Sequence, residues 1–196
     1  MVSEDKSYPL GVWAYYADGS IRDYEHADSN AIGVAVVTAD CSFVIDKTRS
    51  KLAMSSNGNA SENKFNELDI VKTSNLNTAI TDLDGYNNTL KIINHLTSLG
   101  FTSPAVSYCM SQFDGNGYLG AFGEWNAVYT NLSDVNAMLT KIGGTKVQNE
   151  WYTTTSTLYV DWAVFPAAVD RRNGGYSIAR VSFNYSDTEV RAFKAL

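Results

Sequence analysis

Basic residues are scarce in this sequence, which has 15 lysines and arginines against 21 acidic residues and a formal charge of −6. Nucleic acid binding draws its affinity from clustered Lys and Arg side chains that displace counterions from the phosphates. The only adjacent basic pair is Arg171-Arg172, and the other basic residues are scattered. We therefore expect no DNA or RNA partner.

Long apolar runs are absent as well, and the mean hydropathy of −0.19 is typical of a globular protein rather than a membrane protein. Hence no membrane insertion is expected. Residues 1–7 contain no basic segment followed by an apolar stretch, so no secretory signal is visible.

Cysteine and histidine are rare, with two residues of each: Cys41, Cys109, His26 and His95. No C-x-x-C motif and no histidine cluster is present, so the sequence offers no recognisable set of metal ligands. We expect both cysteines to be buried as small apolar side chains, and the sequence leaves a disulfide between them open. His95 falls within a predicted helix, so we expect it on the helix face and not as a general base.

Two pairs of neighbouring carboxylates, Asp23 with Glu25 and Asp82 with Asp84, raise the question of glycosidase chemistry, which needs two acids held across one bond. Both pairs fall in loops or at a strand edge, where a solvated or turn-forming aspartate is the default. The Asp114-Gly115-Asn116-Gly117 segment lacks the later glutamate of a calcium-binding loop and is predicted to be a turn. We expect no catalytic residue, no metal and no cofactor.

Two hairpins are predicted over residues 8–47. An Asp-Gly turn between apolar runs is a strong hairpin signal, and β-branched runs favour strands. The strands are expected at residues 12–16, 32–37 and 42–45, and the turns at Asp18-Gly19 and Ala39-Asp40. The polar residues 55–66 are predicted to form a surface loop.

Two helices are predicted over residues 87–143. Their apolar residues recur at helical spacing, as Leu90, Ile92, Ile93, Leu96 and Leu99 in the first and as Val135, Met138, Leu139 and Ile142 in the second. We expect the first helix to begin at Asn87 or Asn88 and the second at Ser133, because such side chains cap helix N-termini. Gly100 and Gly143 stand where a glycine ends a helix.

The last third returns to strands. Apolar and polar residues alternate in two stretches, which predicts strands with one buried face, at Leu158, Val160, Trp162 and Val164 and at Ala179, Val181 and Phe183. Residues 170–175 form a turn-rich connection, and residues 189–193 are expected as a closing strand. Residues 1–196 are thus predicted to form one α+β domain, with hairpins at 8–47, helices at 87–143 and C-terminal strands at 151–194.

The most specific motif lies at residues 117–126 and reads GYLGAFGEWN. It is similar to the Y-L-P-S-x-G-E-W/L-N segment of C-type-lectin-fold proteins of Bacteroides and their phages, which include the variable proteins of diversity-generating retroelements. Gly120 and Ala121 stand where that family has proline and serine. Weaker matches follow the family order along most of the chain: GVW at 11–13, AIGVAVVT at 31–38, Gly85 with Asn88, Thr89 and Ile92, WYTT at 151–154, Asp161-Trp162, and VRAF at 190–193.

The resemblance implies a single C-type-lectin-like domain with small antiparallel sheets and two or more helices. In that family the final strands and loops form the ligand-binding face, whereas the tryptophan, G-E-W and V-R-x-F positions serve the scaffold. The related formylglycine-generating enzymes depend on two cysteines near the C-terminal end, and no cysteine follows Cys109 here. The resemblance therefore implies a binding module without that oxidation chemistry.

The composition of residues 151–187 supports a recognition surface, because rigid aromatics are mixed there with short polar side chains. The residues expected to contact a ligand are Tyr152, Thr154, Ser156, Asp161, Arg171, Arg172, Asn173, Tyr176, Asn184 and Tyr185. Trp151 and Trp162 are expected in the core. Arg191 is expected to pair with a scaffold carboxylate such as that of Glu124, because a buried arginine without a partner is costly.

Together these observations predict a non-enzymatic recognition protein that binds a host surface protein or glycan. The expected setting is a virion surface or the outside of a cell, as a phage fibre, tail-tip or capsid-attached protein or as a cell-surface adhesin. The alternative is a structural virion component that mediates assembly contacts, with other virion subunits or further copies of this chain as its partners.

Overall fold

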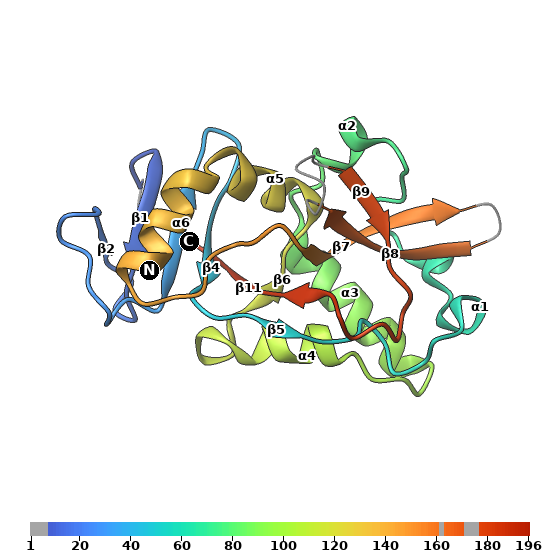
Figure 1. The fold of residues 1–196 in the computed structure, drawn as a ribbon. Coiled ribbons are helices and arrows are strands. Elements are labelled where there is room, and N and C mark those ends of the chain that lie inside the picture. The colour runs from blue at the N-terminus through green and yellow to red at the C-terminus, as the bar shows by residue number, and fades with distance from the viewer. Residues whose placement is uncertain (1–7, 161–162, 171–176) are drawn as a thin grey trace, which may run out of the picture.

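The computed structural model describes residues 8–160, 163–170 and 177–196, which form helices and two sheets (Figure 1). The fold class is α+β, as predicted. The first sheet has the order β2-β1-β3-β4-β11-β6, with β1 Gly11–Tyr15, β2 Ile21–Arg22, β3 Gly33–Val37, β4 Ser42–Asp46, β6 Tyr118–Leu119 and β11 Ala192–Ala195. The second has the order β5-β10-β7-β8-β9, with β5 Ser50–Lys51, β7 Trp151–Val160, β8 Ala163–Asp170, β9 Ser177–Arg180 and β10 Glu189–Val190.

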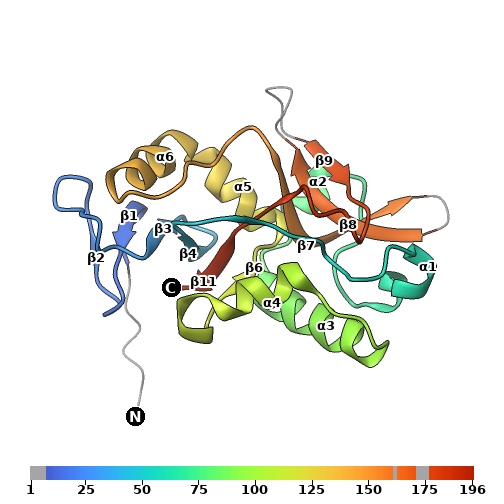
Figure 2. The same ribbon diagram turned by 60° about the horizontal axis from the view of Figure 1, so that its bottom comes forward.

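Helices occupy the chain between the strands: α1 Ala60–Asn63, α2 Leu76–Ala79, α3 Gly85–Ser98, α4 Pro104–Ser111, α5 Phe122–Thr130 and α6 Leu132–Lys141, with 3-10 turns η1 Phe65–Glu67 and η2 Phe113–Gly115. Helix α6 packs on β1 and β3, whereas α3 and α4 pack against each other and against β6. Figure 2 shows α3 and α4 side by side, away from α5 and α6. One apolar cluster joins α5 and α6 to the first sheet, and another joins α3 and α4 to the second.

Both N-terminal hairpins are confirmed. Strands β1 and β2 flank the Asp18-Gly19 turn, where Gly19 has a φ of +80° that favours glycine. Strands β3 and β4 pair on either side of the Ala39-Asp40 turn. The sheet is larger than residues 8–47 alone predict, because β11 pairs with β4 and places Phe193 opposite Ile45.

The predicted helix caps are wrong, whereas the predicted glycine stops are confirmed. Asn87 and Asn88 lie inside α3, and Ser133 lies inside α6. Gly100 and Gly143 adopt φ values of +78° and +73° just beyond the ends of these helices. At α3 and α6 the glycines thus mark the helix ends, whereas Asn87, Asn88 and Ser133 do not mark the starts.

Four helices do not have the periodic pattern on which the prediction relied. Helix α1 falls within the polar stretch predicted to be a loop, and α2 is only four residues long. Helix α4 follows Ser103, whose hydroxyl accepts a hydrogen bond from the Val106 amide. Helix α5 begins within the GYLGAFGEWN motif and is buried on almost every side, so it has no polar stripe.

The alternation at residues 158–164 does not belong to one strand. Strand β7 ends at Val160 and β8 runs back beside it, with Val160 opposite Ala163. Residues 153–158 of β7 are buried on both faces. The pairing of β7 with β8 is also irregular between Thr153 and Thr157.

The predicted closing strand exists, but Arg191 divides it. Residues 189–190 form β10 in the second sheet, between β5 and β7, and residues 192–195 form β11 in the first sheet, between β4 and β6. At this point of the chain a single residue therefore connects the two sheets.

Candidate functional site

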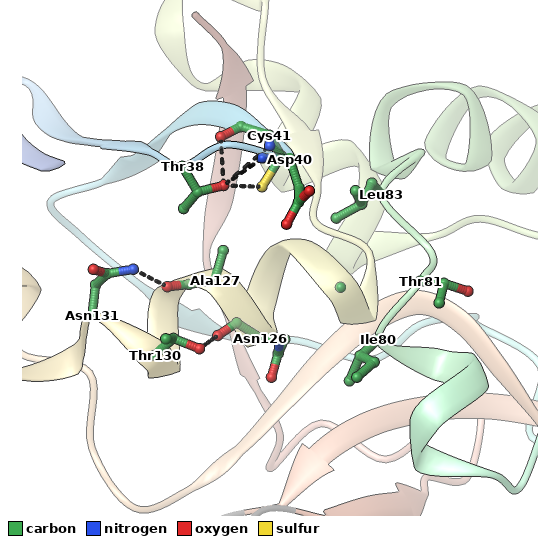
Figure 3. A pocket seen from close by; sticks show the side chains of 11 residues that line it. Thr38, Asp40, Cys41, Ile80, Thr81, Leu83, Asn126, Ala127, Thr130 and Asn131 are labelled. Atoms are coloured by element: carbon green, nitrogen blue, oxygen red, sulfur yellow. Dashed lines mark hydrogen bonds between the residues drawn. The ribbon is translucent and has the colours of Figure 1, made fainter. Parts of the chain in front are cut away.

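An open cleft of about 630 Å³ lies between three segments that are far apart in the sequence (Figure 3). The turn between β3 and β4 supplies one wall, the chain between α2 and α3 a second, and helix α5 the third. Its lining residues are Thr38, Asp40, Cys41, Ile80, Thr81, Leu83, Gly123, Asn126, Ala127, Thr130 and Asn131. Its volume lies within the range of roughly 300–1,000 Å³ that is typical of small-molecule sites.

Hydrogen bonds within the β3–β4 turn fix the first wall. The Thr38 hydroxyl donates to the Cys41 carbonyl at 3.0 Å and accepts from the Cys41 amide at 3.1 Å. The Thr38 amide also donates to the Cys41 carbonyl, at 2.9 Å. This closed turn directs the Asp40 side chain toward the cleft, as Figure 3 shows.

Close backbone packing joins the second wall to the third. The Gly123 amide donates a hydrogen bond of 2.8 Å to the Asp82 carbonyl. A Cβ at Gly123 would overlap the carbonyl oxygens of both Ile80 and Asp82, so no other residue fits there without a shift of the backbone. Helix α5 and the segment before α3 are thus held together as one rigid surface.

Three polar side chains in the cleft keep hydrogen-bonding capacity for a ligand. Among the described residues, no hydrogen bond reaches the Asp40 carboxylate or the Asn126 carboxamide. Asn131 donates through Nδ2 to the Ala127 carbonyl at 2.9 Å, and its Oδ1 keeps its acceptor capacity. The sequence indicated Asp40 only as a turn residue and Asn126 only as part of a motif, so neither was predicted as a site residue.

The Cys41 thiol also lines the cleft, but it is a poor nucleophile there. Burial raises its pKa, and the negative charges of Glu124 and Asp40 raise it further. A thiol needs a lowered pKa to react as a thiolate near neutral pH. Both cysteines are free; Cys109 is fully buried as predicted, whereas Cys41 is only half-buried.

Behind the cleft, the Glu124 carboxyl group is sealed in the interior. It accepts a 2.6 Å hydrogen bond from the Tyr118 hydroxyl and a 2.7 Å hydrogen bond from the Ala121 amide. Burial raises the pKa of Glu124 to about 7, and the charges of Asp82 and Asp84 add to the rise. This carboxyl group links β6 to the first turn of α5, and it has no exposed face for a substrate.

Asp82 is also buried, so it is not solvated, but its carboxylate accepts a 3.3 Å hydrogen bond from the Asp84 amide, as a turn-forming aspartate does. Its carboxylate accepts a hydrogen bond of 2.6 Å from the Ser156 hydroxyl, and Asn88 donates to it at 3.1 Å. The same Ser156 hydroxyl accepts from the Phe122 amide at 3.0 Å. The buried carboxylates of Asp82 and Glu124 therefore connect α3, α5 and β7 instead of facing a ligand.

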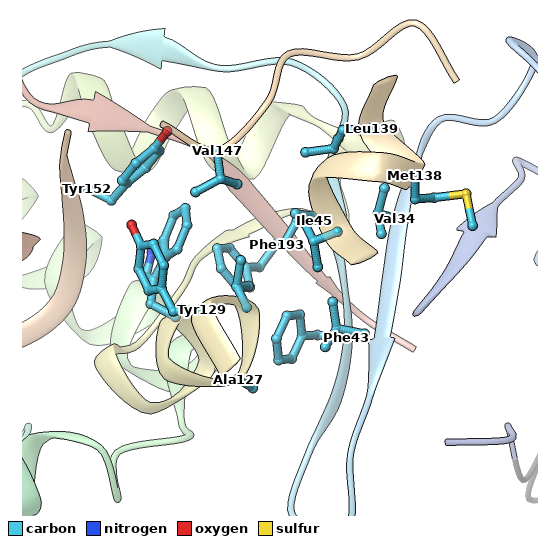
Figure 4. Close-up of a cluster of buried hydrophobic side chains, with 14 of the residues drawn as sticks. Val34, Phe43, Ile45, Ala127, Tyr129, Met138, Leu139, Val147, Tyr152 and Phe193 are labelled. Carbon is cyan, nitrogen blue, oxygen red and sulfur yellow. The ribbon is translucent and has the colours of Figure 1, made fainter. Parts of the chain in front are cut away.

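Three residues predicted to contact a ligand lie in the interior instead. Tyr152, Thr154 and Ser156 are fully buried, which contradicts their expected exposure. In Figure 4 the Tyr152 ring points into the core beside Tyr129, and its centroid lies 4.4 Å from that of Trp125. Trp125 and Phe193, which belong to the G-E-W and V-R-x-F motifs, are also fully buried.

Other predicted contact residues fall outside the described ranges, namely Asp161, Arg171, Arg172, Asn173 and Tyr176, as does Trp162, which was expected in the core. The remaining two, Asn184 and Tyr185, are exposed as expected. The Tyr185 ring lies edge-on to Trp151, with centroids 6.1 Å apart, and Trp151 is half-buried rather than a core residue. We call the area formed by Lys51, Trp151, Asn184, Tyr185 and Asp187 the Tyr185 surface.

Arg191 is structural, but its expected pairing with Glu124 is wrong. Its guanidinium group is fully buried and donates to the Asp46 carbonyl at 2.5 Å and to the Thr145 carbonyl at 2.6 Å. Burial lowers the pKa of Arg191, and the charges of Tyr152 and Asp46 oppose this effect. Arg191 therefore joins main-chain segments to the junction of the two sheets.

The other titratable side chains considered in the sequence have structural or exposed positions. His95 lies on α3 with Nε2 2.8 Å from the Asn63 carbonyl, and His26 is exposed beside Asp23. In residues 8–160, 163–170 and 177–196, no three His, Cys, Asp or Glu side chains are grouped as a metal site requires. Within the same residues, no helix has the length and apolar character needed to cross a bilayer.

Comparisons with protein-family models, with curated proteins and with solved structures found no match to this chain. The C-type-lectin fold that the sequence motifs imply therefore stays a prediction. The α+β architecture is compatible with it.

Proposed function

We propose that this chain is a non-enzymatic recognition domain of a phage virion or a cell-surface adhesin, and that it binds a host protein or glycan through the Tyr185 surface. The observation that carries the proposal is the pairing of an exposed Tyr185 ring with Trp151 at the end of the second sheet. Tyrosine and tryptophan supply rigid contact area at low entropic cost, so they dominate many binding surfaces.

Charged and amide side chains lie near this aromatic pair in the chain or across the sheet, where Glu189 is opposite both Lys51 and Tyr152. Lys51 and Asp187 form an exposed ion pair with Nζ 3.0 Å from Oδ1, and Asn184 is exposed beside Tyr185 in the chain. Exposed ion pairs of this kind contribute little to folding, so both side chains can change partners at low cost. An aromatic centre with an adaptable polar rim suits a protein or glycan ligand.

The state of the buried carboxyl groups and of the cysteine thiols supports the non-enzymatic assignment. Asp82 and Glu124 are engaged in buried hydrogen bonds, and burial raises the pKa of both cysteine thiols. A general acid or base must reach the substrate, and a nucleophilic thiol needs a lowered pKa. These groups act in the scaffold.

The test uses the fluorescently labelled chain on Bacteroides cells and on an array of host glycans. We expect Tyr185→Ala and Asn184→Ala to weaken binding by about tenfold or more, while the thermal midpoint shifts by no more than about 2 °C. Tyr24→Ala is the matched control, because this tyrosine is similarly exposed but lies outside the Tyr185 surface.

Unchanged binding of the Tyr185 and Asn184 variants would show that ligands bind elsewhere, and loss of folding in both would remove the assignment. If the Tyr185 and Asn184 variants were missing from assembled particles, and the isolated chain bound no cell or glycan, the assembly role would replace the recognition role. In that case the Tyr185 surface should be covered by neighbouring subunits that bury about 1,000 Å² or more.

A further inference from the structure

We infer that the cleft between the β3–β4 turn, the chain before α3 and helix α5 is a second binding site, and that its ligand is a neutral saccharide. The cleft shares no residue with the Tyr185 surface, so the two proposals stand independently. Three features of the cleft support this inference: the hydrogen-bonding groups that it leaves available, its charge and its rigidity.

The available groups match the hydroxyls of a sugar. A hydroxyl group donates one hydrogen bond and accepts others, so its site needs both kinds of partner. The Asp40 carboxylate and the Asn131 Oδ1 are acceptors, and the Asn126 carboxamide offers one acceptor and two donors. In Figure 3 Asp40 comes from the β3–β4 turn, and Asn126 and Asn131 come from α5 and the residue that follows it.

Apolar groups in the same cleft match the C–H faces of a sugar ring. Ile80 and Leu83 come from the chain before α3, and the Ala127 methyl comes from α5. Leu83 is 37% exposed although it is large and apolar, so a ligand that covers it gains apolar burial. A ring with polar edges and an apolar face uses both parts of the lining.

The charge of the cleft excludes anionic ligands. Among the described residues that line it, none is lysine, arginine or histidine, and the Asp40 carboxylate is exposed there. Phosphate, sulfate or carboxylate groups on a ligand would meet no cation and at least one like charge.

A cationic ligand fits less well than a neutral one. An ammonium group has only donors, so it would leave the amide donors of Asn126 without a partner. Asp40 is the one carboxylate that lines the cleft among the described residues, whereas strong cation binding uses several. A neutral polyol satisfies Asp40 and Asn126 together.

The cleft is also pre-organised, which lowers the entropic cost of binding. Five hydrogen bonds within residues 38–41 close the first wall, and Gly123 fixes α5 against the opposite segment. The ligand therefore meets an existing set of groups and need not order them.

The test is a titration of the ¹⁵N-labelled chain with glucose, galactose, mannose and N-acetylglucosamine, followed by amide chemical shifts. Glucuronic acid and glucosamine serve as charged counterparts. We expect at least one neutral sugar to shift the amides of Asp40, Cys41, Asn126 and Ala127 in a saturable way. Glucuronic acid should bind about tenfold more weakly than the neutral sugars, because it meets the Asp40 charge.

Two variants locate the site. Asn126→Ala removes a carboxamide that no hydrogen bond reaches among the described residues, and we expect about tenfold weaker binding. Thr81→Arg leaves Asp40 and Asn126 in place and fills the cleft from an exposed position, so it should abolish neutral sugar binding even if the first variant is partly unfolded. Asn94→Ala on α3 is the matched control, because this asparagine is exposed and far from the lining set in sequence.

The proposal fails if no neutral sugar shifts these amides at tens of millimolar, or if the shifts persist in both cleft variants. Tighter binding of glucosamine than of every neutral sugar, lost in Asp40→Asn, would replace it with a cation site. Failure of the Tyr185 variants to affect cell binding would leave this result untouched, because the readouts and residues differ.

Discussion

The Tyr118 hydroxyl lies 2.6 Å from Oε1 of Glu124 and donates a hydrogen bond to it inside the protein. Burial raises the pKa of this glutamate to about 7, so the folded protein holds a proton there at pH values where an exposed glutamate has lost it. The pair therefore couples protonation to the junction between β6 and α5.

Glu124→Gln should change how stability depends on pH. The pKa of Glu124 rises from an ordinary 4.5 to about 7 on folding, so between these values the folded state binds more protons than the unfolded state. Its contribution to stability is thus fully present below pH 4.5 and is lost as pH rises toward 7, by an amount on the order of 3 kcal/mol. We expect urea unfolding of the glutamine variant to show a flatter profile over this range.

The glutamine substitution is a fair comparison because its amide can replace both contacts. Its oxygen can accept from the Ala121 amide, and its NH₂ group can donate to the Tyr118 hydroxyl, which is able to accept. Identical pH profiles for the two proteins would mean that Glu124 is ionised in the fold.

Ser156→Ala should destabilise the protein although it removes a single oxygen atom. That oxygen donates to Asp82 at 2.6 Å and accepts from the Phe122 amide at 3.0 Å, and it is fully buried. We expect a loss of about 2–3 kcal/mol in urea unfolding, because a buried carboxylate loses a donor. Ser133→Ala on the exposed side of α6 is the control, expected within about 0.5 kcal/mol of the parent.

Arg191→Lys should cost about 2–4 kcal/mol even though the charge is kept. The guanidinium group reaches the carbonyls of Asp46 and Thr145 through two different nitrogens, and a lysine has one nitrogen. The exposed Arg22, which pairs with Asp28 at 3.2 Å and lies 4.3 Å from the centroid of the Tyr16 ring, offers the control Arg22→Lys, with an expected change below about 1 kcal/mol. Equal effects at both sites, measured by urea unfolding, would contradict the structural role of Arg191.

Gly85→Ala should disturb the Glu124 carboxyl group by direct overlap. A Cβ at Gly85 would meet Oε2 of Glu124 and would lie 2.8 Å from the Ala121 amide nitrogen. We expect a loss of about 2–3 kcal/mol in thermal or urea unfolding. Gly115→Ala is the control that isolates backbone strain from steric overlap. Its φ of +84° is strained for alanine, but nothing lies near the added Cβ. We expect this variant to lose about 1 kcal/mol of stability.

Local signals in the sequence predicted the hairpins and the helix ends. The Asp18-Gly19 turn needs a left-handed glycine, and Gly100 and Gly143 meet the same requirement beyond α3 and α6. Helix starts were less readable, since several asparagines and serines near α3 and α6 compete as caps. These start positions are decided by packing.

The polar residues of β7 show why the predicted binding face was partly wrong. Thr153, Thr154 and Ser156 suggested a solvated strand, yet each finds a buried partner from a distant part of the chain. Thr153 donates to Thr188 at 2.8 Å, and Thr154 donates to the Ala167 carbonyl at 3.0 Å. Alternation of polar and apolar residues predicts which face of a strand is buried only where the polar side chains are in contact with water.

The cleft could not be predicted from the sequence, for a different reason. Its polar side chains come from a β-turn and from α5, and each has an ordinary local role. No spacing relates Asp40 to Asn126, because the fold alone brings these two segments together. Periodicity and motifs relate residues that are close in the chain.

The division of the C-terminal strand at Arg191 has a consequence for synthesis on the ribosome. Strand β4 is complete long before residues 192–195 leave the exit tunnel, yet its partner on one side is β11. Until then the nascent hairpin carries an open edge, the kind of edge that pairs with other chains. Translation speed between β4 and β11, and any chaperone that shields β4 meanwhile, should therefore govern the yield of native protein.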